Sequence, residues 1–178
     1  MDDGTLTKTG DGYALRFERD IAHPVDNVWA ALTQPDLMKG WLSDNAEVDL
    51  RVGGKVQFHD HQNWGHITAL EEGHTFAFEW KGSDWDGGIV RWELEPTAGG
   101  TRLVLTHEMP AMSDAEAKRF EKDHPGLPAG WHPVSSTLAG WHEIVDRLGA
   151  ALDGTADASA DRHGRWEQLN AHYKQVVS

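Results

Sequence analysis

The chain has 178 residues, 39% of them hydrophobic, and its 29 acidic against 16 basic side chains give a formal charge of -13. This length and composition suit one domain with a substantial core, and the negative field disfavours nucleic acid and anionic membranes as partners. The lack of cysteine excludes disulfides, thiolate catalysis and cysteine-ligated metals. No apolar run approaches the roughly 20 residues of a membrane span, and the acidic, glycine-rich N-terminus lacks the apolar centre of a signal peptide. We therefore expect a cytoplasmic protein.

The N-terminal part of the chain predicts one strand followed by two short helices. Residues 1–11 have the composition of a flexible end. Apolar and charged side chains alternate over residues 13–21, which predicts a half-buried strand. Pro24 and Pro35 each open a short segment with helical spacing, and the second segment ends near Trp41.

Six further strands are expected between the second helix and residue 109. Tight turns such as Gly53-Gly54 separate them, and apolar side chains alternate within each. The expected strands cover residues 47–52, 55–61, 64–70, 75–80, 89–95 and 101–109. About seven strands joined in this way indicate an antiparallel meander.

The C-terminal part predicts a long helix preceded by a long connection. Residues 110–130 form the connection, in which Ser113 and Glu116 have capping-box spacing, and a connection of this length is typical of a lid or binding loop. In residues 131–152 the apolar side chains recur every three or four residues and form one helical stripe, which must pack on a large apolar surface. The stripe consists of Trp131, Val134, Leu138, Trp141, Val145, Leu148 and Leu152. A polar linker and a terminal helix around Trp166 follow, and this helix could pack on its own domain or on a partner.

This order of elements resembles the helix-grip fold of the START / Bet v allergen / polyketide-cyclase superfamily (SRPBCC), and within it the domain named after the activator of the heat-shock protein 90 ATPase. Five stretches carry the resemblance: PVDNVWAALT at 24–33 with Pro35 and Trp41, VDLRVGGK at 48–55, FAFEW at 76–80, GTRLVLTH at 100–107, and Gly140-Trp141 with Val145, Leu148 and Leu152. The resemblance implies an α+β fold in which a curved antiparallel sheet wraps around the long C-terminal helix. We expect a flexible end at 1–11, the helix-grip domain at 12–153, and a linker with the C-terminal helix at 154–178.

The resemblance also implies a cavity between sheet and helix that binds a hydrophobic small molecule. Nine tryptophans are unusual for a chain of this size, and tryptophan-rich domains often line a pocket. The residues expected to line it are Phe58, Phe78, Trp80, Trp92, Leu105, His107, Trp131, Leu138 and Trp141. The alternative is a closed core in which the aromatic rings fill the space and His107 bonds a neighbour.

Two further clusters of polar residues could carry chemistry. His59 and His61 lie two residues apart with His66 across the predicted hairpin, which is a possible metal site. No acidic partner is clearly placed to orient these imidazoles, so an exposed pair fits better, and we expect no metal and no cofactor. His107 and Asp60 could act as a general acid–base pair if they approach within a hydrogen bond. No nucleophile or phosphate-loop motif accompanies them.

Three functions remain open from the sequence. The first is non-enzymatic binding or sequestration of a hydrophobic, aromatic small molecule, as in natural-product resistance or as an accessory to biosynthesis. The second is a co-chaperone-like interaction module, and the third is a cyclase- or hydrolase-type enzyme that uses His107. The corresponding partners are a hydrophobic small molecule, a chaperone or a second copy of the chain.

Overall fold

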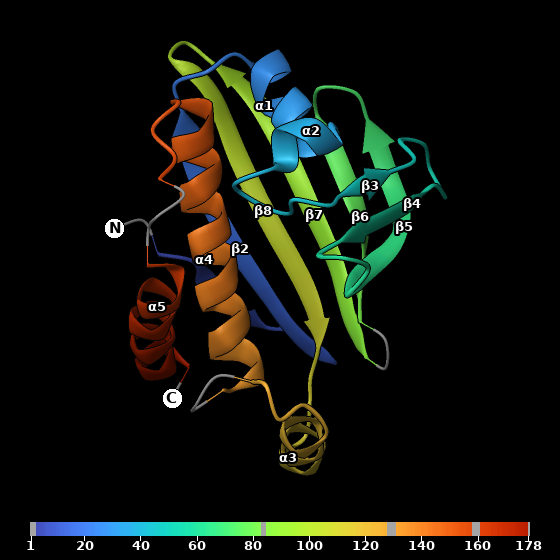
Figure 1. Ribbon diagram of the computed structural model, residues 1–178, viewed down its shortest axis with the longest axis vertical. Helices are drawn as coiled ribbons and strands as arrows, with labels where there is room; N and C mark the ends of the chain where they lie inside the picture. Colours follow the sequence, from blue (N-terminus) through green and yellow to red (C-terminus); the bar gives the residue numbers. More distant parts are fainter. Residues whose placement is uncertain (1–2, 83–84, 128–130, 158–160, 178) are drawn as a thin grey trace.

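A single curved sheet with helices on one face makes up the computed structural model, which describes residues 3–82, 85–127, 131–157 and 161–177 (Figure 1). The eight antiparallel strands run in the order β1-β2-β8-β7-β6-β5-β4-β3. Strands that follow each other in the chain also pair in the sheet, except β2 and β3: β2 pairs with β8 instead, and β3 lies at the far edge. The strands are β1 (Thr5–Lys8), β2 (Gly12–Ile21), β3 (Glu47–Val48), β4 (Lys55–Phe58), β5 (Asn63–Glu71), β6 (Thr75–Lys81), β7 (Asp86–Thr97) and β8 (Gly100–Pro110).

Five helices complete the fold. They are α1 (Val25–Thr33), α2 (Pro35–Met38), α3 (Asp114–Asp123), α4 (Pro133–Leu152) and α5 (Arg162–Val176). The long helix α4 runs along β2 and β8, with α1 and α2 at one end of the sheet and α3 at the other (Figure 1). No helix in the described part of the chain is long and apolar enough to cross a membrane. The predicted α+β helix-grip fold is confirmed.

The core lies between the sheet and the apolar stripe of α4. Val134, Leu138, Trp141, Val145 and Leu148 are all buried, as the three- and four-residue spacing predicts. The inward face of the sheet supplies the matching surface because alternate residues of each strand point to the same side. Its buried members include Phe17, Phe58, Phe78, Val90, Trp92 and Leu105.

Two local predictions require correction. Thr5–Lys8, expected to belong to a flexible end, pairs with β2 as an edge strand, so the sheet has eight strands and not about seven. The strand expected to reach His61 ends at Phe58, because His59, Asp60 and His61 all have positive φ angles of 52°, 54° and 68°. Left-handed backbone cannot continue a strand, so these three residues form a turn.

The terminal helix α5 packs on its own domain, beside α4 (Figure 1). Its contact with α4 is polar as well as apolar: Asn170 Oδ1 accepts hydrogen bonds from Ser135 Oγ at 2.9 Å and Ser136 Oγ at 3.3 Å. The buried Tyr173 hydroxyl accepts a 2.8 Å bond from the backbone N–H of Gly4 and lies 2.7 Å from His142 Nδ1. One hydroxyl therefore joins the N-terminal segment, α4 and α5.

Replacing Tyr173 with Phe tests this junction. We expect Tyr173→Phe to lower the free energy of unfolding by about 1–3 kcal/mol, because a buried N–H and a buried imidazole nitrogen lose their partner. Urea denaturation followed by tryptophan fluorescence measures the change. The control is Tyr13→Phe, at a half-buried tyrosine whose hydroxyl has no hydrogen bond within the described ranges, and its effect should stay within about 0.5 kcal/mol. Equal losses in the two variants would contradict the assignment.

Candidate ligand-binding site

Seven of the nine residues predicted to line a pocket are buried in one core between the sheet and α4. They are Phe58, Phe78, Trp92, Leu105, His107, Leu138 and Trp141. The ring centroids of Phe58 and Phe78 are 5.5 Å apart, and those of Trp92 and Trp141 are 5.9 Å apart. Such spacings are those of rings in contact. Rings predicted to line the pocket therefore touch one another, as the closed-core alternative expects.

Trp80 lies at the margin of this core. It is partly exposed, and its ring packs on Phe58 and Trp141 with centroid separations of 5.7 and 5.2 Å. It follows Phe76 and Phe78 on the inward face of β6, as the period-two pattern predicts. Trp80 is thus the point at which the aromatic core reaches the surface.

Trp131 is the predicted lining residue that the structure places elsewhere. It precedes α4 and stacks on Phe120 of α3, with ring centroids 5.1 Å apart and planes inclined by 24°. Phe120 also stacks on His124 at 4.0 Å and meets the edge of Trp85 at 6.3 Å. We call Trp85, Phe120, His124 and Trp131 the α3 cluster. Sequence reasoning identified the 110–130 connection as a lid candidate but not the Phe120 and Trp85 side chains that anchor it.

A glycine joins the core to the α3 cluster. Gly87 lies beside both Trp80 and Trp85, since a Cβ added there would overlap the Trp85 ring and come within 2.9 Å of Trp80 Cδ1. Only a residue without a side chain leaves room for two indoles to approach the backbone so closely. Aromatic rings therefore extend from Trp141 in the core to Trp80, and from Trp85 to Phe120 on α3, with Gly87 beside both Trp80 and Trp85; we call this set the aromatic row.

His107 is the polar group at the inner end of this row. Its Nδ1 accepts a 2.8 Å hydrogen bond from Trp141 Nε1, and its Nε2 donates a 2.6 Å bond to the Gly87 carbonyl. These bonds fix the neutral tautomer with the proton on Nε2, and burial lowers the pKa of His107 to about 4. With both ring nitrogens bonded, His107 has no free position for proton transfer.

Asp60, the proposed partner of His107, is not near it. Asp60 lies in the exposed turn after β4, where it accepts a hydrogen bond from Asn45 Nδ2. His107 is buried in β8 and bonded to Trp141 and Gly87. The structure does not bring the proposed acid–base pair together.

The three histidines considered as metal ligands are also held separately. His59 is in the left-handed turn, with its pKa lowered chiefly by burial. His61 Nδ1 bonds Gln57 Oε1 at 2.8 Å, and His66 Nδ1 bonds Glu79 Oε2 at 3.0 Å. Within the described ranges no group of three or more His, Cys, Asp or Glu side chains is placed to hold a metal ion.

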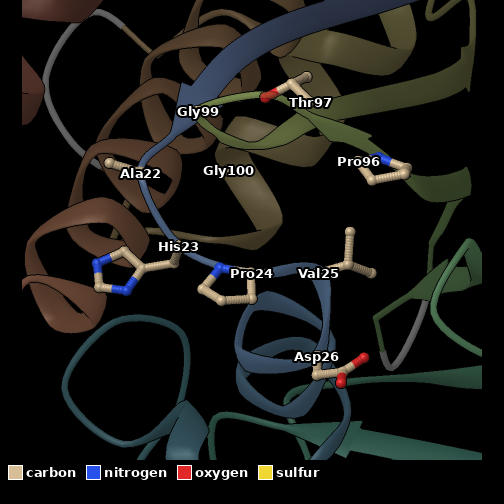
Figure 2. Close-up of a pocket in the computed structure, with 9 residues that line it drawn as sticks. All are labelled: Ala22, His23, Pro24, Val25, Asp26, Pro96, Thr97, Gly99 and Gly100. Atoms are coloured by element: carbon tan, nitrogen blue, oxygen red, sulfur yellow. The ribbon is translucent and has the colours of Figure 1, made fainter.

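Two surface pockets lie outside the aromatic row. The first has a volume of about 470 Å³ and lies between the start of α1 and the β7–β8 hairpin. It is lined by Ala22, His23, Pro24, Val25, Asp26, Pro96, Thr97, Gly99 and Gly100 (Figure 2). The His23 imidazole in this pocket already has a hydrogen-bond partner, because its Nε2 lies 2.8 Å from Asp153 Oδ1. The second pocket, about 400 Å³, lies between α4 and the start of α5 and is rich in charged side chains.

Comparison with known proteins identifies the family. The sequence pattern of the family described as activator of Hsp90 ATPase homolog 1-like protein matches residues 22–153. The chain belongs to this family. The predicted membership is thereby confirmed. No curated protein matches the chain in sequence.

Some solved structures of the same fold match more of the chain than the family pattern does. CalU16 from Micromonospora echinospora is 19% identical, with a TM-score of 0.70 over 98% of this chain and 94% of that one. A conserved protein of unknown function from Enterococcus faecalis, EF2215, is 21% identical, with a TM-score of 0.71 over 98% and 90%. MLL2253 from Mesorhizobium loti is 22% identical, with a TM-score of 0.58 over 80% and 98%. Identities this low establish the shared fold alone.

The buried His107 predicts a specific dependence of stability on pH. Its pKa is lower in the folded chain than in the unfolded one, so its contribution is complete above about pH 6.5 and is lost as the pH falls toward about 4. The difference of about 2.5 pKa units corresponds to roughly 3 kcal/mol at most. Urea denaturation of the original chain and of His107→Gln between pH 7 and 4 isolates the contribution of His107 to the free energy of unfolding. Glutamine keeps a donor and an acceptor but does not titrate. Parallel pH profiles for the two proteins would contradict it.

Proposed function

We propose that the chain binds an apolar, aromatic small molecule without transforming it, at the end of the helix-grip core that α3 covers. The observation that carries this proposal is the position of Phe120 in the α3 cluster. An aromatic ring lies there between Trp131 and His124 and against Trp85, and α3 itself supplies that ring. A ligand ring could take the same place.

The weak attachment of α3 supports replacement of the Phe120 ring by a ligand ring. Among the ten residues of α3 none is buried, and Phe120 is its aromatic contact with the rest of the domain. A helix with so little buried apolar surface is weakly held, so its displacement costs little free energy. Stacking of one aromatic ring can be replaced by stacking of another, with similar burial and geometry.

The row of rings inward from the α3 cluster supports an aromatic ligand over an aliphatic one. A molecule longer than one ring would continue past Trp85 and Trp80 toward Trp141. If it displaced the Trp141 indole, it would have to replace the N–H donor that now satisfies His107 Nδ1. A phenolic hydroxyl does this, so aromatic molecules with a hydroxyl group are the preferred class.

Binding is favoured over catalysis by the arrangement of the polar groups. Both nitrogens of His107 are hydrogen-bonded, and Asp60 lies in a separate exposed turn. A general acid–base role requires a group within hydrogen-bond reach of the substrate and in the correct protonation state. His107 is suited to accept a hydrogen bond from a bound molecule and to remain neutral.

The proposal is tested by titrating the chain with 2-naphthol and following tryptophan emission. We expect saturable quenching, with Trp131→Leu weakening the affinity about fivefold or more, because one face of the stacking site is lost. Phe120→Ala should strengthen binding about threefold or more, since the ring that competes with the ligand is removed. These opposite signs distinguish a shared stacking site from general destabilisation.

The matched control is Trp64→Leu. Trp64 is half-buried on the outward face of β5, between the amino groups of Lys55 and Lys81 at 5.9 and 5.6 Å from its ring. Its replacement should leave the affinity for 2-naphthol unchanged. The proposal fails if 2-naphthol and a panel of larger phenols cause no saturable quenching, or if Trp131→Leu and Trp64→Leu have the same effect.

A further inference from the structure

The outer face of α4 forms one wall of the second surface pocket. Glu143, Asp146, Arg147 and Ala150 recur at three- and four-residue spacing, on the side of the helix opposite the buried Trp141 stripe. The other walls are the start of α5, residues 155–157 and Gly40. This pocket of about 400 Å³ is therefore separate from the aromatic row.

Hydrogen bonds hold three of the charged wall residues in place. Arg147 donates from Nη2 and Nε to the Gly40 carbonyl at 2.6 and 3.2 Å, which ties α4 to the segment after α2. Arg165 Nη2 bonds Asp146 Oδ2 at 2.9 Å, which ties α5 to α4. The walls are thus set before any ligand binds, which lowers the entropic cost of binding.

Two other charged groups in the pocket, Glu143 and Arg162, make no side-chain hydrogen bond within the described ranges. The Glu143 side chain is only 14% exposed, and its nearest cationic atom, Arg147 Nη1, is 3.9 Å away, which is too far for a hydrogen bond. Burial raises the pKa of Glu143 even though Arg147, Arg162 and Arg165 act in the opposite direction. The Arg162 guanidinium has no hydrogen bond or ion pair within the described ranges.

The positive charges of Arg147 and Arg162 also repel each other. The pKa of Arg147 is lowered, first by burial and then by the charge of Arg162. An anion placed between the two guanidinium groups would relieve this repulsion, and a carboxylate can accept hydrogen bonds from both. A cation at Glu143 would in turn stabilise the ionised form of a carboxylate that burial penalises.

We propose that this pocket binds a small zwitterion of the α-amino-acid class, with its ammonium group on Glu143 and its carboxylate between Arg147 and Arg162. One molecule would then give hydrogen-bonded partners to both Glu143 and Arg162. A molecule with a single charge would leave one of the two groups without a hydrogen-bonded partner. A multiply charged anion such as phosphate fits less well, because Asp157 and Asp161 also line the pocket. Small neighbours, Ala150 and Ala156 among them, leave space for an apolar side chain.

Isothermal titration calorimetry with three matched probes tests the inference on the intact chain. L-leucine carries both charges, 4-methylpentanoate lacks the ammonium, and 3-methylbutylamine lacks the carboxylate. We expect L-leucine to bind at least about tenfold more tightly than either of the other two. Equal affinities, or no binding heat with glycine, L-alanine, L-leucine or L-glutamine at about 10 mM, would overturn the proposal.

Two variants identify the groups that bind each end of the zwitterion. Glu143→Gln and Arg162→Gln should each weaken L-leucine binding about fivefold or more. Glu143→Gln should leave 4-methylpentanoate binding unchanged, and Arg162→Gln should do the same for 3-methylbutylamine. The matched control is Arg119→Gln, on the exposed face of α3, which should leave L-leucine binding unaltered. L-leucine binding that survives both Glu143→Gln and Arg162→Gln would refute the site. Quenching by 2-naphthol should persist in both variants, so this test and that of the aromatic site can fail independently.

Discussion

The hydrogen bond from the Trp141 indole to His107 fixes how the long helix lies on the sheet. A buried indole N–H without an acceptor costs about 1–3 kcal/mol, and an aromatic core offers few acceptors. His107 is itself bonded to the Gly87 carbonyl, so one chain of bonds crosses α4, β8 and β7. Trp80 and Trp92 then pack against the oriented ring. Protonating His107 would turn its accepting nitrogen into a donor facing another donor, which is why this core requires a neutral imidazole.

Periodicity predicts the fold and the direction of the core side chains, but not whether they enclose space. The two-residue period placed Phe78 and Trp92 on the inward face, and the helical spacing placed Leu138 and Trp141 opposite them. Whether such rings leave a cavity depends on their rotamers and mutual tilt, as in the 80° angle between Trp92 and Trp141. No pattern in a single sequence carries that information, so the sequence favoured an open pocket without excluding the closed core.

The candidate site residues that lie apart from their expected neighbours do so for local backbone reasons. Trp131 continues the apolar spacing of the helix, but α4 begins at Pro133 after a cap at His132, so Trp131 is free to turn toward α3. His59 and His61 were placed on a strand, whereas three successive non-glycine residues adopt positive φ there. Positive φ is uncommon for residues other than glycine, although His and Asp adopt it more often than most, and nothing in the sequence signals three such residues in succession. Asp60 belongs to the same turn, which places it away from His107.

In the binding mode proposed above, Phe120 determines what kind of molecule the aromatic site would select. Because α3 supplies its own ring to the cluster, any ligand competes with an intramolecular partner that is always present at high effective concentration. The apparent affinity is then the intrinsic affinity reduced by the fraction of chains in which α3 is displaced. Molecules that stack no better than phenylalanine gain nothing from the exchange. Larger planar molecules that reach Trp85 and Trp80 as well gain additional contacts, so the covering helix discriminates against small apolar solutes by the same interaction that keeps the site closed.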